Sequence, residues 1–337
     1  MTSRQRIRAL IARTTADRTG FWLGNPHPDT WPILHRYFGT RTDEELRLKL
    51  CDDFRWLSPQ YLEGTYRHPE GKGLLDVWKR KRSLGEAGPL GQCETVAEVD
   101  SYEWPEVRYI DPGPGVRLLQ AAGHHYRASG FWMPFFHDVT DLFGMENYMV
   151  DLLARPDLVR AATRHVCEFY EAANERFFAE AKGLIDGLFF GNDFGTQRGL
   201  IFAPRHFEEF ILPWIERFAA QAHRHGYQVI LHSCGSVHDI IDPLISAGVE
   251  CLHPLQAKAD RMQAEHLARE FGGRITFFGG IDTQEILVRG TPREVKEEVR
   301  RVRDLLGPHL IVSPSHEAIL PDVPPANIAA LAEAAAG

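Results

Sequence analysis

The sequence lacks several features that would assign it to a specialised class of protein. Its 337 residues contain no run of about 18 uninterrupted apolar residues, so no segment is predicted to span a bilayer. The N-terminal stretch has neither the apolar core nor the small-residue cleavage site of a secretory signal. No basic block occurs and the net charge is -8, which argues against nucleic acid and anionic membranes as partners. We therefore expect a soluble, cytoplasmic protein.

Cysteine is scarce, and its spacing follows no pattern. The five cysteines are scattered and none forms a CxxC pair: Cys51, Cys93, Cys167, Cys234 and Cys251. An odd and sparse set of this kind does not resemble the disulfide framework of a small secreted domain. We therefore expect reduced thiols.

Short apolar runs alternate with amphipathic stretches along most of the chain. Eight runs have strand character: 20–25, 116–123, 130–137, 187–193, 228–235, 249–256, 275–282 and 310–316. Helical stretches separate the later runs, and one of them, 204–226, opens with proline and ends at glycine. This alternation predicts a parallel α/β fold, and eight runs favour a single (β/α)₈ TIM barrel over an open sheet. The glycine-rich fingerprints of the two common nucleotide-binding sheets are absent.

Residues from about 40 to 115 differ in composition from the rest of the chain and are rich in glycine, proline and charged residues. They lack the apolar periodicity of an independent core, yet contain Trp56, Trp78 and Trp104. We predict that this stretch is an irregular elaboration that covers the barrel mouth within a single domain spanning 1–337.

Polar residues gather at the ends of the expected strands, where a barrel carries its functional groups. Besides the residues discussed next, the candidates for substrate binding are Asn25, His27, His137, Gln197, Gln256 and Asp282. Each of them could instead have no role in function, because strand ends are polar wherever the chain leaves the apolar core. Asp282 could equally cap the helix that follows it.

The His-x-Cys pair at residues 232 and 234 is the most specific of these signals. Side chains alternate along a strand, so His232 and Cys234 share the inner face with Ile230. Imidazole and thiolate on one face can both bind one Zn²⁺. His316, at the end of the last expected strand, is the predicted third ligand, which leaves one position open as in catalytic zinc sites. Asp193 is either a helix cap or a buried functional carboxylate.

Several stretches together resemble the uroporphyrinogen decarboxylase superfamily, and within it the zinc-dependent, corrinoid-linked methyltransferases. The matching segments are GNDFGTQRGL with APRHFEEFILPWI, VILHSCGSVHDIIDPLISAGVECLHPLQ, ITFFGGIDTQEIL and LIVSPSHEAILPDVPPANIAAL. The resemblance covers nearly the whole chain, is most specific over 187–331, and implies a (β/α)₈ barrel.

Two departures from the family patterns bear on function. Uroporphyrinogen decarboxylases hold the acid groups of their substrate with an arginine-rich motif near the N-terminus, whereas the corresponding stretch here, GFWLGNPHPDTW, has no arginine. The corrinoid-linked methyltransferases ligate zinc with His-x-Cys and a later cysteine, whose place is taken here by Ser315-His316. The chain has no DxHxxG corrinoid-binding signature, so methylcobalamin would arrive on a separate protein.

Three functional interpretations follow. The first is a zinc-dependent methyltransferase or demethylase acting on a small thiol or methyl ether, with Asp193, His232, Cys234 and His316 as its catalytic residues. The second is a metal-independent decarboxylase or lyase of the same fold, in which Asp193 stabilises a cationic intermediate. The third is a barrel that binds a small molecule without chemistry.

Overall fold

The computed structural model describes residues 1–74, 87–316 and 318–337. Its eight strands all pair in parallel, in the order β1-β8-β7-β6-β5-β4-β3-β2. Their bounds are β1 Gly20–Phe21, β2 Phe54–Leu57, β3 Tyr126–Ser129, β4 Gly187–Gly191, β5 Gln228–His232, β6 Cys251–Leu255, β7 Thr276–Ile281 and β8 Leu310–Pro314. The predicted (β/α)₈ barrel is therefore confirmed.

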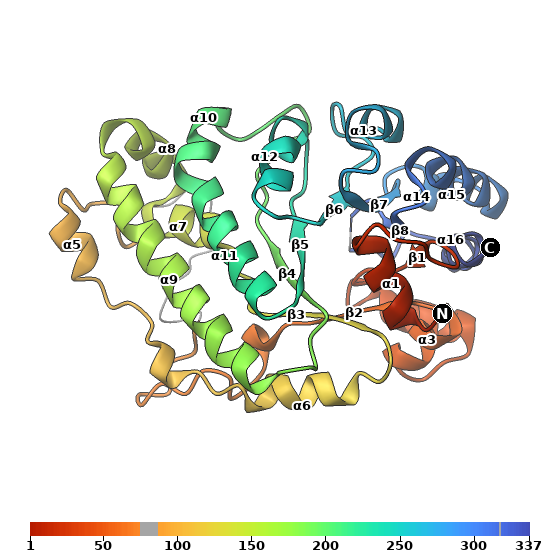
Figure 1. Cartoon of the computed structure of the whole chain (residues 1–337), viewed down its shortest axis with the longest axis horizontal. Helices are drawn as coiled ribbons and strands as arrows, with labels where there is room; N and C mark the ends of the chain where they lie inside the picture. The colour runs from red at the N-terminus through yellow and green to blue at the C-terminus, as the bar shows by residue number, and fades with distance from the viewer. Residues whose placement is uncertain (75–86, 317) are drawn as a thin grey trace.

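Helices follow the strands and form the outer layer (Figure 1). The helices of the first half are α1 Ser3–Ile11, α2 Thr30–Phe38, α3 Asp43–Lys49, η1 Pro59–Tyr61, α5 Val96–Asp100, η2 Val107–Tyr109, α6 Gly113–Ala121, α7 Phe135–Phe143, α8 Met145–Ala154 and α9 Pro156–Glu180. Those of the second half are α10 Pro204–His206, η3 Phe207–Ile211, α11 Leu212–Arg224, η4 His238–Ile240, α12 Ile241–Ser246, α13 Ala264–Phe271, α14 Ile286–Arg289, α15 Pro292–Leu306 and α16 Pro325–Ala336. Among the described residues, no helix is long and apolar enough to cross a membrane.

The first and last strands of this order, β1 and β2, meet through Asp53. Asp53 donates its backbone N–H to Phe21 O over 2.9 Å, and its Oδ2 accepts the Phe21 N–H over 3.1 Å. Asp53 is fully buried and ion-paired with Arg6 and Arg18 at 2.6 and 2.9 Å. Charge-assisted bonds thus take the place of a regular strand ladder at this junction, and the barrel is nearly closed.

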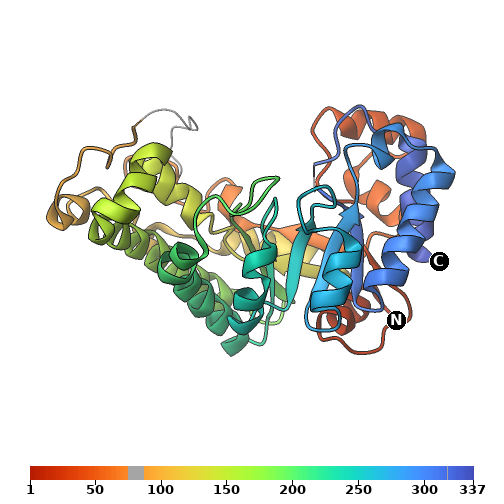
Figure 2. The ribbon, with the colours of Figure 1, turned by 90° about the horizontal axis from the view of Figure 1, so that it is seen from above.

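Two apolar clusters separate the inside of the barrel from the helical layer. Ile230 lies in the inner cluster, as its place in the strand predicts, together with Trp22, Phe189, Phe278 and one side of α1. Helix α1 contacts strands β1, β2, β3 and β8, and Thr276 Oγ1, at the start of β7, donates to Leu10 O over 2.7 Å. Because α1 covers the amino-terminal end of the barrel, the carboxyl ends of the strands form the open mouth. In both ribbon views the two chain termini lie on the same side of the barrel (Figure 2).

Two of the expected strands were placed wrongly. The run 116–123 lies largely in helix α6, and the run 130–137 follows β3 and enters α7. The missing strands are β2 and β3, each of which contains an arginine that hides the apolar pattern. Arg55 donates to Glu44 over 2.9 Å, and Arg127 lies 3.7 Å from Asp186.

The stretch expected to be irregular, 40–115, therefore contains the barrel strand β2 besides α3, α5 and two 3₁₀ turns. Trp56 lies on β2 against Trp132, with ring centroids 4.7 Å apart. Trp104 stacks on His165 of α9 at 4.6 Å, and Trp78 lies outside the described residues. That this stretch covers the mouth, within one domain, stays a prediction.

Candidate metal centre

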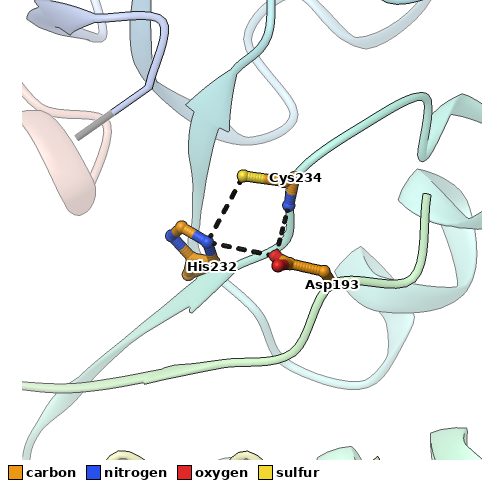
Figure 3. Close-up of side chains that lie close together, drawn as sticks. All are labelled: Asp193, His232 and Cys234. Atoms are coloured by element: carbon orange, nitrogen blue, oxygen red, sulfur yellow. Dashed lines mark hydrogen bonds and ion pairs between the residues drawn. The ribbon is translucent and has the colours of Figure 1, made fainter. Parts of the chain in front are cut away.

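Three side chains of metal-ligand type converge at the carboxyl ends of β4 and β5. His232 ends β5, Cys234 follows two residues later, and Asp193 lies in the loop after β4 (Figure 3). His232 Nε2 is 3.2 Å from Asp193 Oδ1 and 3.6 Å from Cys234 Sγ. The three ligand atoms all lie within 4.8 Å of one another, and the described residues contain no second group of three or more such ligands as close.

The two distances from His232 Nε2 match those of a zinc site. Imidazole, thiolate and carboxylate are all zinc ligands, with Zn–S about 2.3 Å and Zn–N about 2.0–2.1 Å. Tetrahedral angles then place nitrogen and sulfur about 3.6 Å apart, and nitrogen and oxygen about 3.3 Å apart. The observed separations at His232 Nε2, 3.6 and 3.2 Å, agree with both values. Three protein ligands would leave a fourth position open for a substrate.

Backbone hydrogen bonds hold the loop that carries Cys234. The Cys234 N–H donates to Asp193 Oδ1 over 3.0 Å, and the Gly235 N–H donates to Gln256 Oε1 over 2.5 Å. Gly235 has a φ of +85°, and a Cβ there would lie 2.3 Å from the carbonyl carbon of Gly195. Two glycines are therefore required where the loops after β4 and β5 cross, and their contact brings Asp193 next to Cys234.

The charge state of Asp193 follows from its partners. Burial raises the pKa of its carboxyl, but the hydrogen bond and charge of His232, the Cys234 N–H and His137 outweigh this and hold the pKa well below its usual range. His137, on α7, accepts the Asp193 backbone N–H at Nε2 over 2.9 Å. Asp193 is therefore an ionised carboxylate, as metal ligation requires.

The inner side of the site is aromatic. The Trp132 ring meets that of His232 edge to face at 5.3 Å, and Trp132 also packs against Phe189. His253, on β6, lies fully buried behind His232. His253 is one of the polar residues near the expected strand ends but is not among the residues predicted for the site. Strand β6 follows β5 and both carry a histidine near their carboxyl ends, which is a signal that two imidazoles lie side by side.

Comparisons with known proteins agree with the fold and with the resemblance. The family model for uroporphyrinogen decarboxylase (URO-D) matches residues 130–337. The chain belongs to the uroporphyrinogen decarboxylase family. Among curated proteins no match was found. A methyltransferase from Methanosarcina mazei has a similar structure, with a TM-score of 0.69 over 100% of this chain and 98% of that chain, at 16% sequence identity.

In this member of the uroporphyrinogen decarboxylase family, several residues predicted from the sequence lie together. His137, Asp193, His232, Cys234 and Gln256 are linked by the hydrogen bonds and close contacts described above. Gln256 therefore fixes the backbone of the Cys234 loop, and substrate contact by Gln256 or His137 stays a prediction.

His316 lies near this group but is not among its three close ligands. It lines a cavity of about 240 Å³ with Thr283 and Leu320, and its Nδ1 accepts the Ala318 N–H over 3.1 Å. Burial, then the charges of His232 and His316, lower the pKa of His253 well below its usual range, which places His316 within electrostatic reach of the site. Ligation of zinc by His316 stays a prediction.

The remaining candidates are Asp282, His27, Gln197 and Asn25. Asp282 accepts the N–H groups of Gln284, Glu285 and Ile286 over 2.9 to 3.2 Å, which is the capping role weighed against a functional one. His27 and Gln197 are exposed and Asn25 is half-buried. Substrate binding by Asn25, His27, Gln197 and Asp282 stays a prediction.

Proposed function

We propose that this chain is a zinc-dependent enzyme that transfers or removes a methyl group, with a small thiol or methyl ether as its substrate. The observation that carries the proposal is the spacing of His232 Nε2, Cys234 Sγ and Asp193 Oδ1 at the barrel mouth. The fold shared with an archaeal methyltransferase supports it, although at 16% identity that likeness speaks for the fold alone. The corrinoid-bearing partner predicted from the sequence is part of the proposal.

His232 and Cys234 would be two of the protein ligands. Asp193 is the third ligand that the geometry favours, because its Oδ1 lies 3.2 Å from His232 Nε2. His316, predicted from the sequence, is the other candidate. With either third ligand, the donor set leaves an open position for substrate.

Bound Zn²⁺ would supply Lewis acidity, which lowers the pKa of a thiol or polarises an ether oxygen. The corrinoid of the partner would supply the methyl group to a thiol held at the open position, and the thiol would give up its proton to solvent. The residues of this chain orient the substrate: Trp132 provides an apolar wall beside His232, and His137 fixes the backbone of Asp193.

Metal analysis tests the site directly. We would purify wild type and the Cys234→Ala, Asp193→Asn and His316→Ala variants without added metal and measure zinc per chain. Cys51→Ala is the matched control, because Cys51 is exposed and not among the clustered ligands.

We expect about one zinc per chain in wild type and in the control, and loss of most zinc with Cys234→Ala because the thiolate supplies ligand charge. Loss with Asp193→Asn but not with His316→Ala identifies Asp193 as the third ligand, and the reverse identifies His316. Zinc-free wild type, or full occupancy without Cys234, contradicts the proposal and favours the metal-independent decarboxylase or lyase.

Transfer itself would be measured with zinc-loaded protein, free methylcobalamin and a series of thiols, by the change in corrin absorbance. We expect methyl transfer to at least one small thiol, and none with Cys234→Ala. If no thiol or methyl ether reacts while a carboxylic acid substrate is decarboxylated, the methyl-transfer assignment is wrong.

A further inference from the structure

Two histidines from neighbouring strands share one hydrogen bond inside the barrel. His232 on β5 and His253 on β6 are paired in register. Their Nδ1 atoms lie 3.0 Å apart, and the two residues are 5% and 0% exposed. Water cannot compete for this bond, so each ring determines where the other carries its proton.

Only one arrangement of protons leaves His232 ready to bind a metal. Its Nε2 is the nitrogen that faces Cys234 Sγ and Asp193 Oδ1, so Nε2 must present a lone pair. When a metal ion replaces the proton that His232 Nε2 gives to Asp193 in the metal-free protein, a neutral His232 carries its proton on Nδ1 and donates it to His253 Nδ1. His253, as the acceptor, must carry its own proton on Nε2.

The surroundings of His253 favour that arrangement. Its ring lies among the rings of Phe278, Trp22 and Phe189, at centroid distances of 4.7, 5.2 and 5.4 Å. Within the described residues, His253 Nε2 is buried and has no hydrogen-bond partner. An N–H group gains weak stabilisation from aromatic faces, whereas a bare ring nitrogen there loses its hydrogen bond without compensation. The aromatic pocket therefore keeps the His253 proton on Nε2 and leaves Nδ1 as an acceptor.

We propose that His253 is a positioning residue, which holds His232 in the tautomer and ring orientation that bind metal. This inference rests on the proposed zinc site, because only a ligating His232 requires a lone pair on Nε2. Outer-shell partners of ligating histidines change metal affinity by about 10- to 100-fold when replaced. An imidazole in that role leaves no charged partner behind His232, in contrast to the carboxylate that often takes this place.

Two variants separate the hydrogen bond from the packing. His253→Phe keeps an aromatic ring but removes the acceptor, whereas His253→Asn places an acceptor oxygen at the same distance along the side chain as Nδ1. His309→Phe, half-buried at the amino-terminal end of β8, is the matched control for replacing histidine by phenylalanine. Zinc affinity would be measured by competition with a chromophoric chelator, and folding by thermal unfolding.

We expect His253→Phe to bind zinc about 10- to 100-fold more weakly than wild type, with His253→Asn recovering most of that loss and the control unchanged. With Co²⁺ in place of zinc, the thiolate charge-transfer band should persist in both variants, while the ligand-field bands change only in His253→Phe. If His253 acted only through packing, the smaller asparagine would not restore zinc affinity.

Nitrogen NMR of the zinc-loaded wild type with labelled histidine shows which ring nitrogen of His232 and of His253 carries the proton. It needs no substitution, so it tests the inference even if His253→Phe does not fold. We expect the proton of His232 on Nδ1 and that of His253 on Nε2. A proton on His253 Nδ1, or wild-type affinity and cobalt spectrum in His253→Phe, overturns this inference while the zinc site stands. If the wild-type protein does not bind zinc, both the zinc site and the positioning role of His253 are wrong.

Discussion

Replacing Gly235 by alanine tests whether the crossing of two loops builds the metal centre. Gly235 follows Cys234 directly, and its φ of +85° is one that alanine rarely adopts. The added Cβ would lie 2.3 Å from the carbonyl carbon of Gly195, which belongs to the loop that carries Asp193. The substitution therefore adds backbone strain and also drives the two ligand-bearing loops apart.

The two effects have different magnitudes and different consequences. Alanine in the left-handed region costs about 1–2 kcal/mol of stability. An ordinary carbon contact begins at 3.4 Å, so the loops must separate by about 1 Å to accommodate the new methyl group. Metal ligands tolerate deviations of only about 0.2 Å from their preferred distances. We therefore expect zinc affinity to fall at least tenfold, in addition to the loss of stability.

Gly226→Ala introduces the same backbone strain without the steric contact between loops. Gly226 has a φ of +75°, but nothing lies within 4 Å of an added Cβ. Denaturant unfolding should show about 1–2 kcal/mol of destabilisation for Gly226→Ala, and chelator competition should show unchanged zinc affinity. If Gly235→Ala matches Gly226→Ala in both measurements, the crossing of the loops does not position the ligands and the reasoning is refuted.

Two further predictions concern the barrel junction and the thiols. Asp53→Ala removes the buried carboxylate that pairs with Arg6 and Arg18, while Arg6 keeps its ion pair with Asp17, and should lower the free energy of unfolding by about 1–3 kcal/mol. Asp157→Ala, at an 80% exposed side chain, should change it by less than about 0.5 kcal/mol. Equal effects in denaturant titrations would contradict the role of Asp53 at the junction. Iodoacetamide should modify Cys234 in zinc-free protein and do so at least tenfold more slowly with zinc bound, while Cys251 stays unmodified because burial raises the pKa of its thiol. Mass spectrometry checks both thiols, and an equal rate at Cys234 with and without zinc would argue against zinc ligation.

The later half of the barrel could be predicted from the sequence because its signals are local. Strands β4 to β8 are almost wholly buried, so nearly every residue in them is apolar or small. The alternation of side chains along β5 places His232 on the inner face with Ile230, whatever the rest of the chain does. Both facts depend only on backbone geometry and burial.

Strands β2 and β3 depend on contacts that the sequence does not display. Arg55 and Arg127 interrupt the apolar pattern, and their burial is possible because Glu44 and Asp186 arrive from other elements. The run 116–123 also contains an arginine, Arg117, and is largely helical, since a short and mostly apolar run does not distinguish a strand from a buried helix. The strand count was therefore right while two positions were wrong.

The completion of the candidate site was decided by tertiary structure alone. His232 and Cys234 are two residues apart and could be paired from their spacing, but Asp193 reaches them only because Gly195 and Gly235 allow two loops to cross. His253 lies behind His232 because the register of the parallel strands β5 and β6 pairs these two residues. Spacing along one strand is a property of the chain, whereas proximity between strands depends on register and loop packing, which only the folded barrel determines.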